Sequence, residues 1–194
     1  MKLDALLDRK PTIVALAGPN GAGKSTFHSA FLADSGLRFI NADTLAQGLE
    51  LGPYDAAELA NKIRQELVAN RESFIFETVF SDPVGDKVSF LRKAANSGYS
   101  VILCFIGLDS AEISDERVAM RVSQGGHDVP TRKVRSRYRR TLKNLRRAIN
   151  ALPLVLVYDN SDLRKPFRPV ARFIDGREIW ASARRAEWLD QVVE

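Results

Sequence analysis

Residues 18 to 25 follow the spacing G-x-x-x-x-G-K-S, which combines glycines with one lysine and one hydroxyl. The segment and the next residue read Gly18, Pro19, Asn20, Gly21, Ala22, Gly23, Lys24, Ser25 and Thr26. The glycines let the backbone turn tightly enough to aim several N–H groups at one anion. Lys24 can reach the β- and γ-phosphates of a nucleotide, and the Ser25 hydroxyl can bind Mg²⁺. We predict an ATP and Mg²⁺ site built from these nine residues.

The sequence around this segment supports the prediction. Residues 12–17 are a short apolar run with β-branched members, which is typical of a buried parallel strand. After the loop, Phe27, Ala30 and Phe31 recur at helical spacing. The order strand, glycine-rich loop, helix is the context that a phosphate loop requires. A glycine-rich turn that only joins a strand to a helix is the alternative.

Strand-like and helix-like patterns alternate along the whole chain. Five expected strands occupy residues 12–17, 37–40, 74–76, 100–106 and 154–158. This alternation predicts an α/β fold of the P-loop NTPase type, with a parallel five-stranded sheet flanked by helices. Near the end of the chain, Asp175-Gly176 separates two strand-like runs and predicts a C-terminal β-hairpin. A chain of 194 residues suits one domain, which we place over residues 1–194.

Polar side chains follow the second and third expected strands. Asn41 and Asp43 come after one, and Glu77 and Thr78 come after the other. Ligands of open α/β sheets bind at the carboxyl ends of strands, so we expect these residues to contact substrate. Asp43 could accept a proton from a substrate hydroxyl, and Glu77 could help to hold Mg²⁺. The alternatives are that Asp43 caps a helix starting near Thr44 and that Glu77 is a solvated strand end.

Residues 111–140 predict a lid made of two helices. Arg117 and Arg121 are four residues apart and share one helix face, and a break at residues 124–130 precedes a strongly basic helix. Such a lid could exclude water and place guanidinium groups on the transferring phosphoryl group. Its arginines could equally form a solvated basic face. His127, within the break, is a candidate substrate contact or an ordinary turn residue.

Basic charge is concentrated in that second helix. Residues 131–150 contain nine Lys or Arg and no acid, which leaves 20 basic and 24 acidic residues elsewhere in a chain of net charge +5. An apolar seam on the helix should dock on the protein. It consists of Val134, Tyr138, Leu142, Leu145 and Ile149. A basic helix also fits nucleic acid. Aromatic side chains are not interleaved with the charges, however, so a nucleic-acid partner is not favoured.

Residues 159–161, Asp-Asn-Ser, follow the fifth expected strand. In a nucleotide kinase this loop passes near the base, which makes Asn160 a candidate nucleotide contact, and an ordinary turn is the equal alternative. The strand followed by Asp159 also resembles the Mg²⁺-binding strand of many P-loop ATPases. That interpretation would take the metal role from Glu77, and the sequence does not choose between them.

The remaining features favour a cytoplasmic protein. No apolar run approaches the roughly 18 residues of a membrane span. Acidic residues within the first ten positions are unlike a signal peptide. The single cysteine, Cys104, lies in an apolar run and should be a buried strand residue.

Taken together, these segments resemble the zeta-toxin family of P-loop kinases. The likeness lies in residues 17–26, 40–43 and 76–78, in Arg121 with the Gly-Gly-His-Asp-Val-Pro run at 125–130, and in residues 144–145 and 158–160. Characterised toxins of the family phosphorylate the 3′-hydroxyl of the sugar in UDP-N-acetylglucosamine. The resemblance therefore implies an ATP-dependent kinase for a small molecule, with a UDP-N-acetylglucosamine-like acceptor and, more weakly, an antitoxin partner.

The resemblance also implies residue roles. Lys24 would contact phosphates, Ser25 would bind Mg²⁺, and Asp43 would be the base. Glu77 would contact substrate or metal. Arg121 would be a lid residue, together with either Arg135 or Arg137. Two other functions stay open: a P-loop kinase for an antibiotic or another sugar, and a nucleotide-dependent ATPase that binds nucleic acid.

Overall fold

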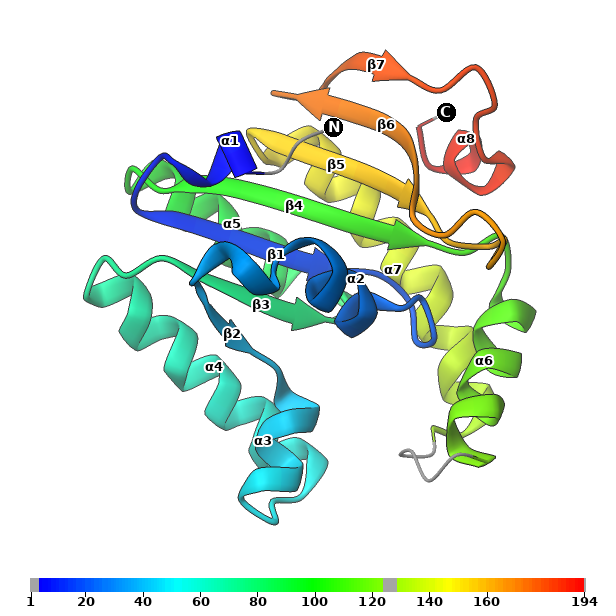
Figure 1. The fold of residues 1–194 in the computed structure, drawn as a ribbon, viewed down its shortest axis with the longest axis horizontal. Helices are drawn as coiled ribbons and strands as arrows, with labels where there is room; N and C mark the ends of the chain where they lie inside the picture. Colours follow the sequence, from blue (N-terminus) through cyan, green and yellow to red (C-terminus); the bar gives the residue numbers. More distant parts are fainter. Residues whose placement is uncertain (1–3, 124–128, 194) are drawn as a thin grey trace.

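A computed structural model describes residues 4–123 and 129–193, and its centre is one seven-stranded sheet (Figure 1). The strands follow the spatial order β2-β3-β1-β4-β5-β6-β7. Their bounds are β1 Thr12–Ala17, β2 Arg38–Ile40, β3 Phe74–Thr78, β4 Ser100–Gly107, β5 Leu154–Asp159, β6 Arg168–Ile174 and β7 Arg177–Ala181. The first five pair in parallel, as the alternating sequence pattern predicted.

The sheet has seven strands rather than the five expected, because the C-terminal hairpin joins it. β6 pairs antiparallel with β5, and β7 pairs antiparallel with β6. The hairpin itself was predicted correctly: Asp175 and Gly176 at its tip have φ values of 47° and 78°, the left-handed conformations that a tight turn between twisted strands needs. Its pairing covers an edge of β5 that would otherwise expose unpaired backbone groups.

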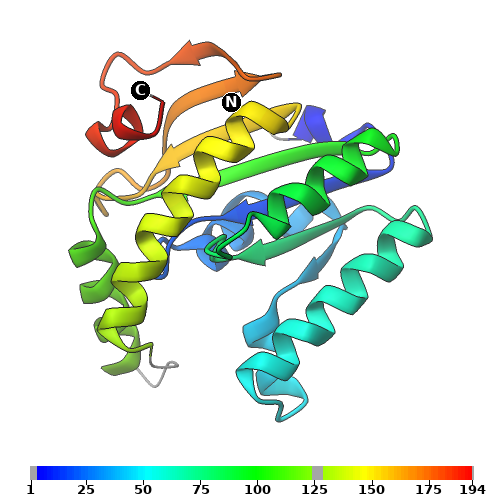
Figure 2. The ribbon, with the colours of Figure 1, turned by 180° about the vertical axis from the view of Figure 1, so that it is seen from behind.

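Helices cover both faces of the sheet. Their bounds are α1 Asp4–Leu7, α2 Lys24–Phe31, α3 Ala42–Gly48, α4 Pro53–Ala69, α5 Asp86–Asn96, α6 Ala111–Ser123, α7 Thr131–Ala151 and α8 Glu187–Val193, with a 3₁₀ turn at Ala33–Ser35. Figure 2 shows α4, α5 and α7 lying side by side across one face, and Figure 1 shows α2 on the other.

Two hydrophobic clusters follow from the alternation of side chains along the strands. Ile13 and Ala15 of β1 belong to the cluster beneath α4, α5, α7 and α8, whereas Val14 and Leu16 belong to the cluster beneath α2. Every residue of β1 is fully buried, which explains why its sequence is apolar without alternation. Cys104 of β4 is buried as expected, and burial raises the pKa of its thiol to about 12.

The basic helix α7 docks through the predicted apolar seam. Val134, Tyr138, Leu145 and Ile149 are buried, and Leu142 packs against both hydrophobic clusters. Polar residues on the same side of α7 hold the loop after β3. Thr141 Oγ1 donates to the Val79 carbonyl at 2.8 Å. Asn144 Nδ2 donates to the carbonyls of Phe80 and Asp82 at 2.9 and 2.8 Å. This loop leads directly away from Glu77 and Thr78, so α7 fixes one wall of the site described next.

Within the described residues, every helix is too short or too polar to cross a membrane.

Candidate active site

The glycine-rich loop connects β1 to α2, in the order that the sequence predicted. Gly18 has a φ of 151°, and a Cβ there would lie 2.1 Å from the Ile106 carbonyl oxygen. Gly23 precedes α2 in a left-handed conformation, with a φ of 84°. A side chain at either position would therefore strain or displace the loop.

Two side chains from other segments donate hydrogen bonds to backbone carbonyls of the glycine-rich loop. Ser114 Oγ on α6 donates to the Asn20 carbonyl at 2.6 Å. Asn160 Nδ2 donates to the Ala22 carbonyl at 2.9 Å, and Asn160 Oδ1 accepts from the Phe167 N–H at 3.2 Å. The Asn160 amide is thus engaged at both ends and only 3% exposed. Asn160 positions the loop, and its direct contact with nucleotide stays a prediction.

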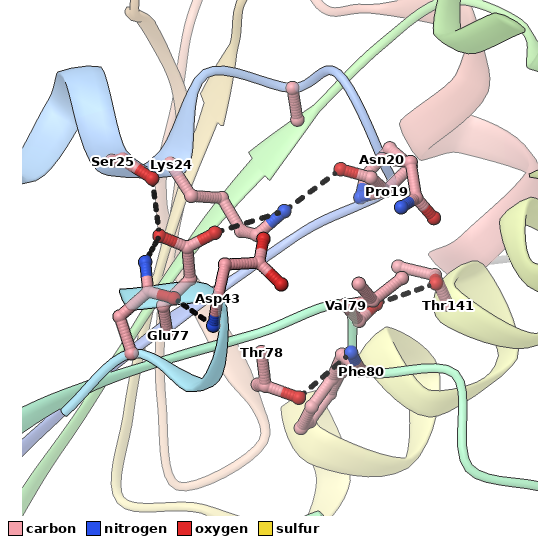
Figure 3. A network of polar contacts seen from close by, with 12 residues as sticks. Pro19, Asn20, Lys24, Ser25, Asp43, Glu77, Thr78, Val79, Phe80 and Thr141 are labelled. Carbon is pink, nitrogen blue, oxygen red and sulfur yellow. Dashed lines mark hydrogen bonds and ion pairs between the residues drawn. The ribbon is translucent and has the colours of Figure 1, made fainter. Parts of the chain in front are cut away.

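Lys24 and Glu77 form the centre of a polar network (Figure 3). Lys24 Nζ donates to the Pro19 carbonyl at 3.0 Å and lies 3.7 Å from Glu77 Oε1. Burial lowers the pKa of Lys24, and Arg121 acts in the same direction, while the carboxylates of Glu77 and Asp43 oppose the shift. The ammonium group is therefore buried between acidic partners, where it could also meet phosphate oxygens.

Glu77 is held by three partners from two other segments. Besides Lys24, Ser25 Oγ donates to Glu77 Oε2 at 2.7 Å and Asn41 Nδ2 donates to the same oxygen at 3.0 Å. The alternative in which Glu77 is only a solvated strand end is wrong, because its side chain is 14% exposed and both of its carboxylate oxygens have partners.

Asn41 also explains how Asp43 is presented. Asn41 Oδ1 accepts from the N–H groups of Asp43 and Thr44, at 2.8 and 3.4 Å, and so caps the N-terminus of α3. The alternative in which Asp43 is the cap is therefore wrong. Asp43 lies in the first turn of α3, exposed, with its carboxylate pointing toward the Lys24 ammonium (Figure 3).

A cavity of about 460 Å³ brings the predicted acceptor-side residues together. Its lining includes Asn20, Asn41, Asp43, Glu77, Thr78, Arg121 and Arg137. Thr78 Oγ1 also accepts from the Phe80 N–H at 3.1 Å and shapes the turn after β3. Arg135, the alternative to Arg137, is exposed and lies 3.9 Å from Glu112 on α6. Of the two candidate arginines, Arg137 is the one at the cavity.

The predicted residues around 124–128, including His127, lie outside the described part of the chain. Arg117, which sequence spacing grouped with Arg121, donates from Nη2 to the Ser161 carbonyl at 2.9 Å. α6 packs closely on the phosphate loop at this point, since a Cβ on Gly21 would lie 2.9 Å from the Arg117 Cβ. Arg117 therefore links α6 to the loop after β5.

Three cationic residues that line the cavity were not predicted from the sequence, and one of them is Lys133 of α7. Arg64 of α4 and Lys87 of α5 are the other two, and Arg64 is buried. The α4 segment was interpreted from its apolar positions alone, and an arginine in such a helix is usually solvent-exposed. The available signal was that Arg64 lies four residues after Ala60 and three before Leu67, on the apolar face of the helix.

The oxygens of Ser25 and Glu77 fit a magnesium ion. A hydroxyl and a carboxylate oxygen 2.7 Å apart are hard donors of the kind that Mg²⁺ prefers, and Mg²⁺ commonly uses one or two carboxylates together with phosphate oxygens. Among the described residues there is no cluster of three or more His, Cys, Asp or Glu side chains that could bind a metal ion through protein ligands alone.

Asp159, the alternative metal residue, is engaged elsewhere. It forms an ion pair with Arg168 Nη2 at 2.9 Å and accepts hydrogen bonds from Ser161 Oγ and Trp188 Nε1.

The parallel sheet, the phosphate loop and its buried lysine define a P-loop nucleotide-binding protein. Residues 40–165 match the family model described as zeta toxin. An uncharacterized protein of Haemophilus influenzae is 30% identical over 126 residues, which cover 62% of this chain and 88% of that protein. The chain belongs to the zeta toxin family, and it is an ATP-dependent phosphotransferase.

Solved structures share the fold. AvrRxo1-ORF1:-ORF2 with ATP is similar at a TM-score of 0.69 and 19% identity, covering 99% of this chain and 67% of that one. A chain of the PezAT chromosomal toxin–antitoxin system of Streptococcus pneumoniae is similar at a TM-score of 0.57 and 15% identity, covering 96% of this chain and 78% of that one.

The phosphate loop lies before residues 40–165, the segment that the family model matches. The structure places the loop in contact with that segment, because Ser25 of α2 and Asn41 both donate hydrogen bonds to Glu77.

Proposed function

We propose that the chain, acting as a single domain over residues 1–194, transfers the γ-phosphoryl group of ATP to a hydroxyl group of a small molecule. The observation that carries this proposal is the position of Asp43. It lines the cavity, and its negative charge is close enough to Lys24 to raise the pKa of the ammonium group against the effect of burial. A carboxylate beside the phosphate-binding lysine can accept the proton of an attacking hydroxyl as the phosphoryl group moves.

Asp43 suits the role of base better than Glu77 does. Both Glu77 oxygens face donors, from Lys24 at one and from Ser25 and Asn41 at the other. Within the described residues, the Asp43 carboxylate has no hydrogen-bond partner, and only its backbone N–H is used in the α3 cap. Glu77 therefore holds Lys24 and Ser25 in position, and Asp43 is available to a substrate proton.

The other residues would neutralise charge. Lys24 would contact the β- and γ-phosphates, and Ser25 with Glu77 would hold Mg²⁺, which supplies further positive charge to the phosphates when bound. Arg121 and Arg137 line the cavity from α6 and α7 and would stabilise the charge on the transferring phosphoryl group. Closure of the two helices over the site would exclude water, which favours transfer to a hydroxyl over hydrolysis.

A sugar nucleotide similar to UDP-N-acetylglucosamine is the proposed acceptor. Family membership supports this choice, and a cavity of about 460 Å³ is within the range of small-molecule sites. The test is to incubate the protein with ATP, Mg²⁺ and a panel of acceptors that includes UDP-N-acetylglucosamine, other sugars and aminoglycoside antibiotics. Mass spectrometry should find a gain of one phosphate on the sugar nucleotide. Product from a different acceptor would keep the kinase and reject this substrate.

A nucleic-acid-dependent ATPase is the second candidate, favoured by the exposed basic residues of α7. It predicts salt-dependent binding of single- or double-stranded polynucleotide. Fluorescence anisotropy at low salt separates the two functions, since a small-molecule kinase should leave the labelled polynucleotide unbound.

We also propose that an antitoxin protein binds this chain, because the fold is similar to that of a chain of the PezAT toxin–antitoxin system. If the enzyme is a toxin, induced expression of the wild type should slow bacterial growth, whereas Lys24→Ala should not. Equal growth of both strains would reject the toxin role and leave the kinase assignment intact.

A further inference from the structure

The cavity contains a buried positive charge that the proposed transfer does not use. Arg64 of α4 lines the cavity and is only 4% exposed. Within the described residues, its guanidinium makes a single hydrogen bond, from Nη2 to Asn61 Oδ1 at 3.1 Å, and its Nε is buried without a partner. A buried charge is costly unless it is paired, so this arrangement calls for an anion.

Packing against Phe76 accounts for one face of the Arg64 guanidinium, but it does not satisfy the N–H groups in the guanidinium plane. The Arg64 Cζ lies 5.0 Å from the centroid of the Phe76 ring, a cation–π contact that supports the planar group from one side. Such a contact leaves the in-plane N–H donors unused. Burial lowers the pKa of Arg64 to about 10, with no carboxylate acting in the opposite direction, so the group is still cationic at neutral pH.

A second cation lies close by. Lys87 of α5 lines the same cavity, and its pKa is lowered first by burial and then by the positive charge of Arg64. Asp82 and Asp86 oppose that shift. Asp82 also lines the cavity, but its carboxylate accepts from the Asp86 N–H and lies 3.5 Å from Asn144 Nδ2. Among the described residues neither carboxylate pairs with Arg64, and the Arg64 Nε stays buried without a partner.

We propose that Arg64 and Lys87 form an anion-binding subsite for a phosphate or diphosphate group of the acceptor. This inference rests on the proposed function, because it concerns the acceptor side of the same cavity. A planar guanidinium with free in-plane donors matches phosphate oxygens in a bidentate manner, and a lysine adds a second point charge. The acceptor is then a phosphorylated alcohol, such as a sugar nucleotide, and not a neutral sugar.

The subsite is tested by isothermal titration of inorganic pyrophosphate into protein loaded with Mg²⁺ and a non-hydrolysable ATP analogue, which occupies the phosphate loop. We expect Arg64→Gln to weaken pyrophosphate binding by about ten- to a hundredfold, the usual effect of losing a charged hydrogen-bond partner. Arg64→Lys should retain part of the affinity. Lys62→Gln, on the same helix but exposed and paired with Glu58, is the matched control and should bind as the wild type does.

Several results would overturn the subsite. They are an unchanged pyrophosphate affinity in folded Arg64→Gln protein, equal wild-type affinity for the dicarboxylate malonate, and no wild-type binding below about 10 mM pyrophosphate. If Arg64→Gln does not fold, Lys87→Gln serves instead, since Lys87 is only partly buried.

Phosphoryl transfer to UDP-N-acetylglucosamine is scored separately. Arg64-dependent pyrophosphate binding without transfer would keep the subsite and reject the proposed acceptor. Transfer with an unchanged KM in Arg64→Gln would keep the kinase and reject the subsite.

Discussion

Replacing Asp43 by Asn gives the sharpest test of the proposed chemistry. The substitution keeps the shape of the side chain but removes the negative charge that would accept the substrate proton. The α3 cap should survive, because Asn41 provides it through the backbone N–H groups of Asp43 and Thr44. Loss of an acid from the first helical turn should cost only about 0.3–1 kcal/mol of folding stability.

The expected effect on catalysis is much larger. A positioned general base contributes roughly 10²- to 10⁴-fold, which corresponds to about 3–5 kcal/mol of transition-state stabilisation. The loss should appear in kcat. Nucleotide affinity should stay within about twofold, because Lys24 keeps its contacts with Pro19 and Glu77.

The assay measures acceptor phosphorylation by mass spectrometry and nucleotide binding by calorimetry on the same preparation. Asp55→Asn is the matched control, because Asp55 is an exposed acid in the first turn of the neighbouring helix α4. A folded Asp43→Asn enzyme with half or more of the wild-type kcat would refute Asp43 as the base. Equal losses in both variants would attribute the effect to the general charge of the site.

Three further predictions follow from positions around the site. Arg137→Ala should lower kcat about a hundredfold, as expected for a transition-state donor, whereas Arg135→Ala should change it little; equal effects in steady-state kinetics would contradict the placement of these arginines. Asn160→Asp should destabilise folding by about 1–3 kcal/mol in urea denaturation, because a carboxylate oxygen would face the Ala22 carbonyl; an unchanged midpoint would argue against this support. Cys104, with its thiol pKa raised to about 12 by burial, should resist iodoacetamide at pH 8 until the protein unfolds, and rapid alkylation of native protein would contradict that burial.

Local sequence signals predicted the elements that depend on neighbouring residues. The phosphate loop and the Asp175-Gly176 turn were recognisable because their conformations depend on a few consecutive residues. The five parallel strands and the seam of α7 followed from hydrophobic patterning, which directly reflects which faces are buried. The pairing of the hairpin with β5 was not predictable in this way, because it depends on a sheet edge that exists only after folding.

The sequence by itself predicted the parallel α/β sheet and a phosphate loop that presents Lys24 and Ser25, because both depend on short local patterns. Only the tertiary structure decided which partners the remaining polar residues of the cavity have. Glu77 meets Ser25 across 52 positions of sequence, and Asn41 takes the helix cap that Asp43 could have taken. Arg64 is buried at the cavity, although arginine side chains are normally exposed. These assignments depend on distances between segments remote in sequence, and such distances are set only when the helices pack on the sheet.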